Sequence, residues 1–311
     1  MSKHYLKAHL LLMAVAWIYG ANYSIAKIIL DPGLIAANGF ILLRLLAGAL
    51  LFILFFGLPK KVERSDWQAL LFCAFTGVFA NQLLFFNGLA LTSPIHASLI
   101  MICTPIIVML IRVVQGQTMN AIQWAGCFLG FGGAYLVIRS SYQTDGSGAS
   151  LSGDLMVLLN ALFFGLFLSK APALISKYGS FELMKWLFLT AVLMCLPFGF
   201  TQLLHVRWEI MEEVHWLSLG FVLLCTTFLA YAFNAKALEY SHPGLVSNYI
   251  YLQPLIAAFI AVMLKKDHLS SWHLYSGLMI MTGVYLAGGK LPVGLEKYFP
   301  GVKKILFREQ E

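Results

Sequence analysis

Charge is scarce in this chain. Asp, Glu, Lys and Arg make up only 11% of its 311 residues, whereas hydrophobic residues make up 60%. Soluble domains average about 25% charged and 45–50% apolar residues, so this composition excludes a conventional water-soluble enzyme. Ten membrane-spanning helices of about 20 residues each would use roughly 200 residues and leave no room for a sizeable soluble domain.

Catalytic and nucleotide-binding motifs are also missing. The sequence has no HExxH zinc motif, no catalytic carboxylate pair and no ATP-binding loop, so we expect neither an enzyme nor a protein that needs a cofactor. It contains no CxxC pair either. The five cysteines all fall inside apolar runs, which favours small hydrophobic helix residues over disulfides or a metal site: Cys73, Cys103, Cys127, Cys195 and Cys225.

Apolar runs extend over most of the chain, whose mean hydropathy is +0.80. Turn residues such as Asp31-Pro32-Gly33 and Asp145-Gly146-Ser147-Gly148 separate the runs. The pattern predicts an all-α polytopic membrane protein with ten transmembrane helices. We expect these helices at residues 8–30, 35–57, 68–91, 94–114, 121–139, 152–171, 181–203, 215–238, 243–264 and 272–289.

Lysine and arginine are distributed unevenly over the connecting loops. With the N-terminus placed in the cytoplasm, fifteen of these residues fall inside and five outside, and Arg44 remains within the second span. Because cytoplasmic loops carry the excess of positive charge, we expect a multi-pass protein of the cytoplasmic (inner) membrane with both termini in the cytoplasm. The net charge of +7 therefore reflects sorting across a bilayer, and no nucleic-acid partner is expected. The basic tail at 290–311 is either an amphipathic segment on the cytoplasmic leaflet or a solvated tail.

An internal repeat divides the chain into halves. Ten residues separate Ser93-Pro94 from Pro105, and ten separate His242-Pro243 from Pro254. The offset between the two patterns is 149 residues at both prolines. Five helices per half is an odd number, so the second half must enter the membrane from the opposite side, which predicts two inverted five-helix repeats of the kind found in secondary transporters. We expect the two repeats at residues 8–139 and 152–289.

Several short motifs carry a family resemblance. They are Trp17-x2-Gly20-x-Asn22-Tyr23, Arg44-Leu45-Leu46-Ala47-Gly48, Ser93-Pro94 and the glycine-rich fifth and tenth spans. In their order and repetition they resemble the drug/metabolite transporter superfamily, specifically an EamA-type ten-helix transporter. The resemblance implies a carrier, often an exporter, of amino acids or other small metabolites. The second repeat departs from the pattern, because Lys185-Trp186 stands where an arginine like Arg44 would be expected.

Polar and aromatic residues within the spans indicate where a solute binds. An unpaired polar group in the hydrocarbon core costs free energy, so such residues face the bundle interior or a water-filled cavity. For any single Asn or Gln, a hydrogen bond between helices is the favoured explanation. The set as a whole lies on helices one, three, four, six, eight and nine, which the resemblance places around a central cavity. The predicted substrate-binding residues are Asn22, Tyr23, Gln82, Phe86, Ser98, Met101, Asn160, Phe164, Tyr231, Asn234, Asn248 and Tyr251.

Two prolines and several charged residues complete the candidate features. Pro105 and Pro254 remove a backbone donor, so each is either a simple packing kink or a break that exposes backbone polarity near the midplane. An unpaired Arg44 within its span would cost at least ~2.5–3.5 kcal/mol, so we expect it to find a partner or to line an aqueous path. Lys27 and His96 lie nearer the span ends, where we expect them to reach the interface. We expect no carboxylate at mid-membrane and therefore no proton coupling through one.

These features predict a secondary transporter that moves a small organic solute by alternating access. The solute is expected to be an amino acid or related metabolite, and export is favoured by the resemblance alone. The aromatic content of 14% suits a partly apolar organic solute better than an inorganic ion. The expected partners are a small-molecule substrate and the lipid bilayer. A membrane channel or a non-transporting scaffold is the alternative, and the sequence leaves the oligomeric state open.

Overall fold

The computed structural model describes residues 3–30, 34–140, 150–241, 245–246, 249–265 and 270–287. Within these ranges no strand occurs, and the predicted tail at 290–311 lies outside them. The α-helices are α1 (Lys3–Ile29), α2 (Ala37–Phe56), α3 (Trp67–Ala74), α4 (Ala80–Leu91), α5 (Pro94–Met101), α6 (Thr104–Val114), α7 (Ala121–Ser140), α8 (Leu151–Tyr178), α9 (Ser180–Leu204), α10 (Glu213–Phe221), α11 (Ala230–Tyr240), α13 (Gln253–Met263) and α14 (Ser271–Ala287). Shorter segments are the 3-10 helices η1 (Arg64–Asp66), η3 (Trp208–Ile210) and η5 (Tyr249–Leu252), and the π-helices η2 (Phe75–Phe79) and η4 (Val222–Leu229).

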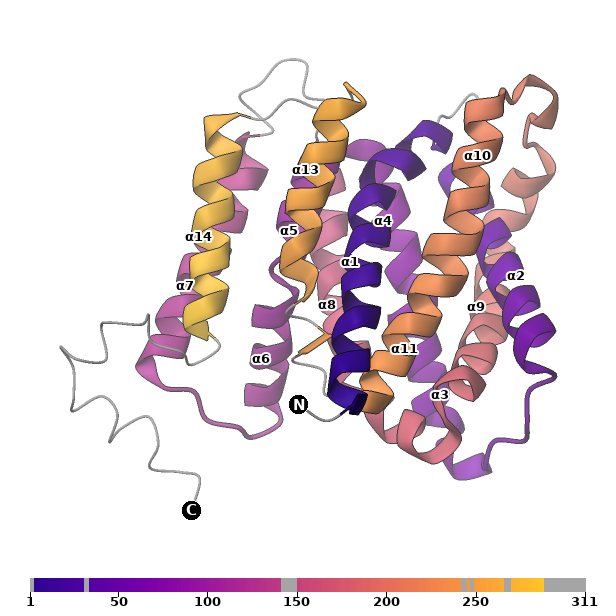
Figure 1. The fold of residues 1–311 in the computed structure, drawn as a ribbon, viewed down its shortest axis with the longest axis horizontal. Coiled ribbons are helices and arrows are strands. Elements are labelled where there is room, and N and C mark those ends of the chain that lie inside the picture. The colour runs from indigo at the N-terminus through magenta and orange to yellow at the C-terminus, as the bar shows by residue number, and fades with distance from the viewer. Residues whose placement is uncertain are drawn as a thin grey trace.

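In the described part of the chain these segments form ten helical rods, as the sequence predicted (Figure 1). The composite rods are η1–α3–η2–α4, α5–α6, α10–η4–α11 and η5–α13. Seven rods are long and apolar enough to cross a membrane by themselves, and shorter apolar helices cover Ala121–Val137 and Tyr249–Met263. Helix α1 begins and α14 ends on the same side of the molecule, as an even number of passes requires (Figure 1).

One predicted helix end was wrong. Helix α8 does not stop at residue 171 but continues through Pro172 to Tyr178. The extension persists because Leu174 and Ile175 are buried, and a proline inside a membrane helix is tolerated where neighbouring groups satisfy the backbone.

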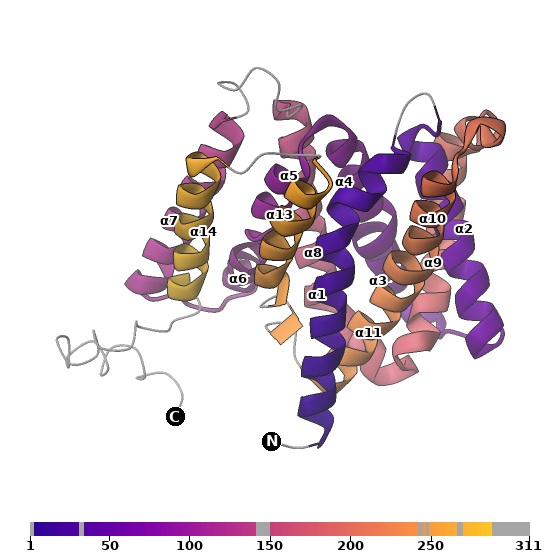
Figure 2. The ribbon, with the colours of Figure 1, turned by 45° about the horizontal axis from the view of Figure 1, so that its top comes forward.

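The helix contacts follow a two-fold pattern that exchanges the halves. Two equivalent helix pairs pack against each other across the two-fold axis: α2 with α9, and α7 with α14 (Figures 1 and 2). The remaining contacts occur in matched pairs. Helix α4 packs on α8 as α11 packs on α1, and α6 packs on α8 as α13 packs on α1. The equivalent helices α1 and α8 run in opposite directions. Lys27, in the last turn of α1, donates to the carbonyl of Thr92, and Ser150, just before α8, donates to the carbonyl of the neighbouring Leu91. The two five-helix repeats are therefore inverted.

Glycines allow one helix pair of this arrangement to touch backbone to backbone. A Cβ atom at Gly283 of α14 would lie 2.3 Å from the backbone nitrogen of Gly130 on α7, and one at Gly126 would lie 2.5 Å from the carbonyl oxygen of Gly283. Small residues at such positions let membrane helices approach closely enough for extensive van der Waals contact. The glycine-rich fifth and tenth spans thus form one interface, at the side of the bundle farthest from α2 and α9 in both ribbon views (Figures 1 and 2).

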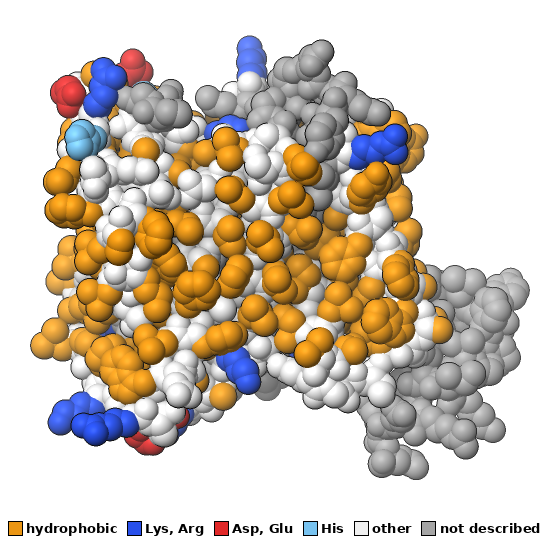
Figure 3. Space-filling view, turned by 180° about the vertical axis from the view of Figure 1, so that it is seen from behind, with side chains coloured by type: hydrophobic (Ala, Val, Ile, Leu, Met, Phe, Trp, Pro, Cys, Tyr) orange, Lys and Arg blue, Asp and Glu red, His pale blue; other side chains and the backbone are white. Residues whose placement is uncertain are grey.

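The outer surface of the bundle is apolar. Large hydrophobic side chains such as Leu54 (71% exposed), Phe128 (74%) and Leu193 (69%) face outward. Figure 3 shows such side chains over the middle of one face, with Lys, Arg, Asp and Glu confined to its upper and lower margins. An apolar band between charged margins is the surface that a bilayer requires.

Pro105 and Pro254, which occupy equivalent positions in the two repeats, each lie at the start of a new helix segment. Pro105 lies in the first turn of α6, after the interruption at residues 102–103, and Pro254 lies in the first turn of α13, after η5. Because Pro105 has no N–H, it leaves the carbonyl of Met101 without its helical donor. The Thr104 hydroxyl donates to that carbonyl at 2.8 Å, so this carbonyl has a hydrogen-bond donor despite the proline.

Candidate functional site

A cavity lies between the two repeats. Its wall is built by α1, α4, α8, α11 and η5, with single residues from α2, α5, α9 and α13 and with Val246. The volume open to the centre of a water-sized sphere is about 100 Å³. A single water needs roughly 10–15 Å³ by this measure, so the space holds about seven to ten waters or one small solute.

Nine of the twelve residues predicted to bind substrate line this cavity: Asn22, Tyr23, Gln82, Phe86, Met101, Asn160, Phe164, Tyr231 and Asn234. Ser98 does not, because it is fully buried and its hydroxyl donates to the carbonyl of Ile95 in its own helix at 2.8 Å. Tyr251 lies in η5 but is not part of the wall. Asn248 lies outside the described residues.

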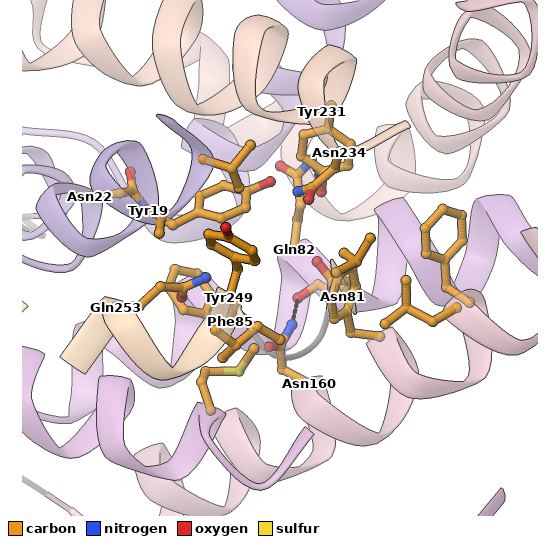
Figure 4. Close-up of a pocket in the computed structure, with 18 of the residues that line it drawn as sticks. Tyr19, Asn22, Asn81, Gln82, Phe85, Asn160, Tyr231, Asn234, Tyr249 and Gln253 are labelled. Atoms are coloured by element: carbon orange, nitrogen blue, oxygen red, sulfur yellow. Dashed lines mark hydrogen bonds between the residues drawn. The ribbon is translucent and has the colours of Figure 1, made fainter. Parts of the chain in front are cut away.

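Further wall residues were missing from the predicted set: Tyr19, Asn81, Phe85, Tyr249 and Gln253. Gln253 had a usable signal, because it is a polar residue directly before Pro254 in an apolar run. Tyr19 lies one helical turn from Tyr23 on the same face of α1. Figure 4 shows these side chains around the cavity together with Asn22, Gln82, Asn160, Tyr231 and Asn234.

Hydrogen bonds across the cavity join one repeat to the other. Gln82 Nε2 donates to the Tyr231 hydroxyl at 3.3 Å, and the Tyr23 hydroxyl donates to Gln253 Oε1 at 3.2 Å. Asn160 Nδ2 donates to the carbonyl of Asn81 at 2.6 Å (Figure 4). Each bond pairs a residue of the first half with one of the second, so relative movement of the halves must break or exchange these bonds.

Other polar atoms of the wall have no partner among the described residues. They are Asn22 Oδ1, Gln82 Oε1, Asn160 Oδ1 and one guanidinium nitrogen of Arg44, Nη1. A buried polar atom without a hydrogen bond costs about 1–3 kcal/mol, so four of them around one space form a surface ready to bond water or a polar solute.

Arg44 is the one charged residue among the described residues of the wall. It is 2% exposed, and its Nε donates to the Thr227 hydroxyl at 2.8 Å while Nη2 donates to that of Thr226 at 3.4 Å. The Phe86 ring lies 4.1 Å from the guanidinium carbon. Arg44 therefore both finds polar partners and borders the cavity.

A second polar cluster lies between the helices near the end of α1. Lys27 donates to the Thr92 carbonyl, the Thr92 hydroxyl donates to the Asp154 carboxylate, and His96 Nδ1 lies 3.2 Å from the same carboxylate. Asp154 is 0% and His96 2% exposed. The expectation that His96 reaches the membrane interface was wrong, because His96 is buried beside the Asp154 carboxylate at the start of α8. Lys27 is half-buried and donates to the Thr92 carbonyl.

We expect Asp154→Ala to lower the free energy of unfolding by about 3 kcal/mol, because it leaves the buried Thr92 and His96 groups without their acceptor. A melting curve of the purified protein in detergent measures the effect. Glu63→Ala is the matched control, since its ion pair with Lys177 is exposed and contributes little. Equal melting temperatures for the two variants would contradict a structural role for the cluster.

Comparisons with known proteins agree with this architecture. The model of the family described as "EamA-like transporter family" matches residues 6–139 and 151–289. A protein of Archaeoglobus fulgidus, described as an uncharacterized transporter, is 27% identical over 294 residues, which cover 91% of this chain and 98% of that protein. The uncharacterized transporter YyaM of Bacillus subtilis is 30% identical over 172 residues, covering 53% of this chain and 55% of YyaM.

Two more similarities extend over most of the chain. An uncharacterized transporter of Methanothermobacter thermautotrophicus is 25% identical over 243 residues, which cover 73% of this chain and 66% of that protein. A solved structure titled only as the crystal structure of a protein aligns with a TM-score of 0.64 over 90% of this chain and 98% of its own, at 14% identity. That structure supports the fold alone.

Proposed function

Since the chain belongs to the EamA-like transporter family, we propose that it is a secondary carrier that moves a small organic solute across the cytoplasmic membrane by alternating access. The observation that carries the proposal is the cavity between the inverted repeats, with its four unpartnered polar atoms. The repeats proposed to move against each other are residues 8–139 and 152–289. The proposed solute is an amino acid or a related metabolite, and the proposed direction is export from the cell. Both termini of the protein are proposed to face the cytoplasm.

The composition of the cavity wall supports an organic solute. Phe85, Phe86, Phe164 and Tyr231 present ring surfaces, while the amides of Asn22, Gln82 and Asn160 present hydrogen-bonding atoms. Sites for small organic molecules combine a mostly apolar wall with a few placed polar groups. An inorganic ion would instead need a shell of oxygen ligands or charges.

Alternating access is supported by where the fold is interrupted. The α5–α6 rod breaks at residues 102–103, and the equivalent rod of the second repeat carries η5 at Tyr249–Leu252. Both interruptions lie beside the cavity, which Met101, Tyr249 and Ile250 line. Broken helices at the interface of inverted repeats are the places where carriers change which side of the membrane reaches the site.

Counterflow in liposomes tests the proposal. Purified protein is reconstituted into vesicles loaded with unlabelled amino acids, and uptake of trace labelled amino acid is followed against protein-free vesicles. A carrier gives transient accumulation above equilibrium that saturates and is competed by related solutes. A channel gives only downhill equilibration. Absence of flux for amino acids and for a pool of other metabolites, from folded protein, would support the scaffold alternative instead.

A further inference from the structure

Arg44 carries a positive charge that nothing in the described part of the chain neutralises. No Asp or Glu lines the cavity among the described residues, and no described carboxylate forms an ion pair with Arg44. An arginine side chain stays protonated in proteins. A buried cation without a counter-charge is unfavourable, and intramembrane charges of this kind mark solute pathways or binding sites.

The two threonine hydroxyls that accept hydrogen bonds from Arg44 have other hydrogen-bond partners. The hydroxyls of Thr226 and Thr227 both donate to the carbonyl of Val222, at 2.8 and 2.9 Å, and accept from Arg44 with their lone pairs. The wide turn of the π-helix η4 brings these two consecutive side chains to the same carbonyl. Because both hydroxyls stay bonded without the arginine, Arg44 is poorly explained as a support for η4.

The threonines and Phe86 instead orient the guanidinium. They fix Nε and Nη2, while Nη1 stays buried with no partner among the described residues, in a side chain that lines the cavity. An arginine held in this way keeps a donor available for an anionic group, and carboxylates are the organic anions that its planar fork fits best.

We propose that Arg44 binds the carboxylate of the transported solute and makes a carboxylate a requirement for binding. This inference rests on the proposed function and specifies its substrate class. The unpartnered oxygens of Asn22, Gln82 and Asn160 accept hydrogen bonds from the remainder of the solute, and the aromatic wall contacts its apolar part. An amino acid and a simple carboxylic acid both meet the requirement, whereas an amine or a carboxamide does not.

The test compares matched ligands on purified wild-type protein by their effect on the melting temperature. The panel contains the amino acids, the carboxamide of each, the corresponding acids without the amino group, the corresponding amines without the carboxyl group, and chloride. A ligand that binds only the folded state raises the melting temperature according to its affinity. We expect every stabilising organic compound to carry a carboxylate, and its carboxamide to bind at least about 30-fold more weakly.

Arg44→Gln is expected to bind the acids at least about 30-fold more weakly than the wild type. Arg44→Lys is expected to recover part of that affinity. Without ligand, the melting temperature of Arg44→Gln should equal or exceed that of the wild type, because an uncompensated cation has been removed. A purely structural role predicts a decrease. Arg112→Gln is the matched control, since Arg112 is exposed on α6 and does not line the cavity.

Several outcomes would overturn the inference. They are stabilisation by carboxamides or amines as strong as by the acids, wild-type affinity in Arg44→Gln, stabilisation by chloride but by no carboxylate, or stabilisation by nothing in the panel. Counterflow of a solute without a carboxylate would refute the role of Arg44 and leave the carrier proposal intact. Absence of all flux would refute the carrier proposal itself.

Discussion

Alanine in place of Asn22, Gln82 or Asn234 is expected to reduce solute flux about tenfold while the amount of protein in the membrane stays near that of the wild type. Each of these amides lines the cavity, and a hydrogen bond lost to a bound solute weakens binding by about 1–1.5 kcal/mol. Initial rates of uptake into liposomes, normalised to reconstituted protein, measure the effect.

Asn87→Ala is the matched control for these substitutions. Asn87 is an amide on the same helix as Gln82, but it bonds to Asn38 Oδ1 at 2.8 Å and does not line the cavity. We expect this variant to transport at the wild-type rate. Wild-type flux from all three cavity variants at normal membrane levels would contradict the placement of the solute site.

Leucine in place of Gly283 is expected to prevent accumulation of folded protein. The new Cβ atom would meet the backbone of Gly130 at 2.3 Å, and backbone atoms of two packed helices cannot move aside as a flexible side chain does. The α7–α14 interface would then separate, at a cost of more than about 3 kcal/mol. The fraction of detergent-solubilised protein that elutes as a single symmetric peak in size-exclusion chromatography measures the loss.

Gly132→Leu, on the partner helix α7, is the control for this substitution. The nearest atom to a Cβ at Gly132 is Met279 Cε at 3.5 Å, which is an ordinary contact with the end of a flexible side chain. This variant should give a peak close to that of the wild type. Equal yields of folded protein from the two variants would show that the close approach of α7 and α14 is dispensable.

The architecture could be predicted because its determinants are local or periodic. A run of about 20 apolar residues identifies a span without knowledge of its neighbours. The common spacing from Pro94 to Pro105 and from Pro243 to Pro254 revealed the repeat, and the odd number of helices per half required the inversion. The cavity wall followed from helical faces, since the polar residues of equivalent spans turn toward the same interior.

The errors arose where structure depends on partners distant in the chain or on irregular helix geometry. His96 is held by Asp154, which belongs to the other repeat, and no local pattern indicates that contact. Tyr251 was placed on the wall from a period of 3.6 residues, but it lies in a 3-10 segment whose shorter period changes the facing. The positions of Thr226 and Thr227 beside Arg44 likewise depend on the π-helix η4, and the apolar pattern of the sequence does not predict a π-helix there.

The most direct test of the central claim is whether the cavity can be reached from both sides of the membrane. Ala235 lines the cavity and tolerates a cysteine with little change in volume, whereas Ala232 on the same helix is buried away from it. Each is replaced by cysteine in a background without the five native cysteines. A membrane-impermeant thiol reagent is then applied from either side, with and without transported solute. The account predicts that the cysteine at 235 reacts from both sides, that solute slows the reaction, and that the cysteine at 232 is inert. Reaction at 235 from one side only, or no faster than at 232, would contradict it.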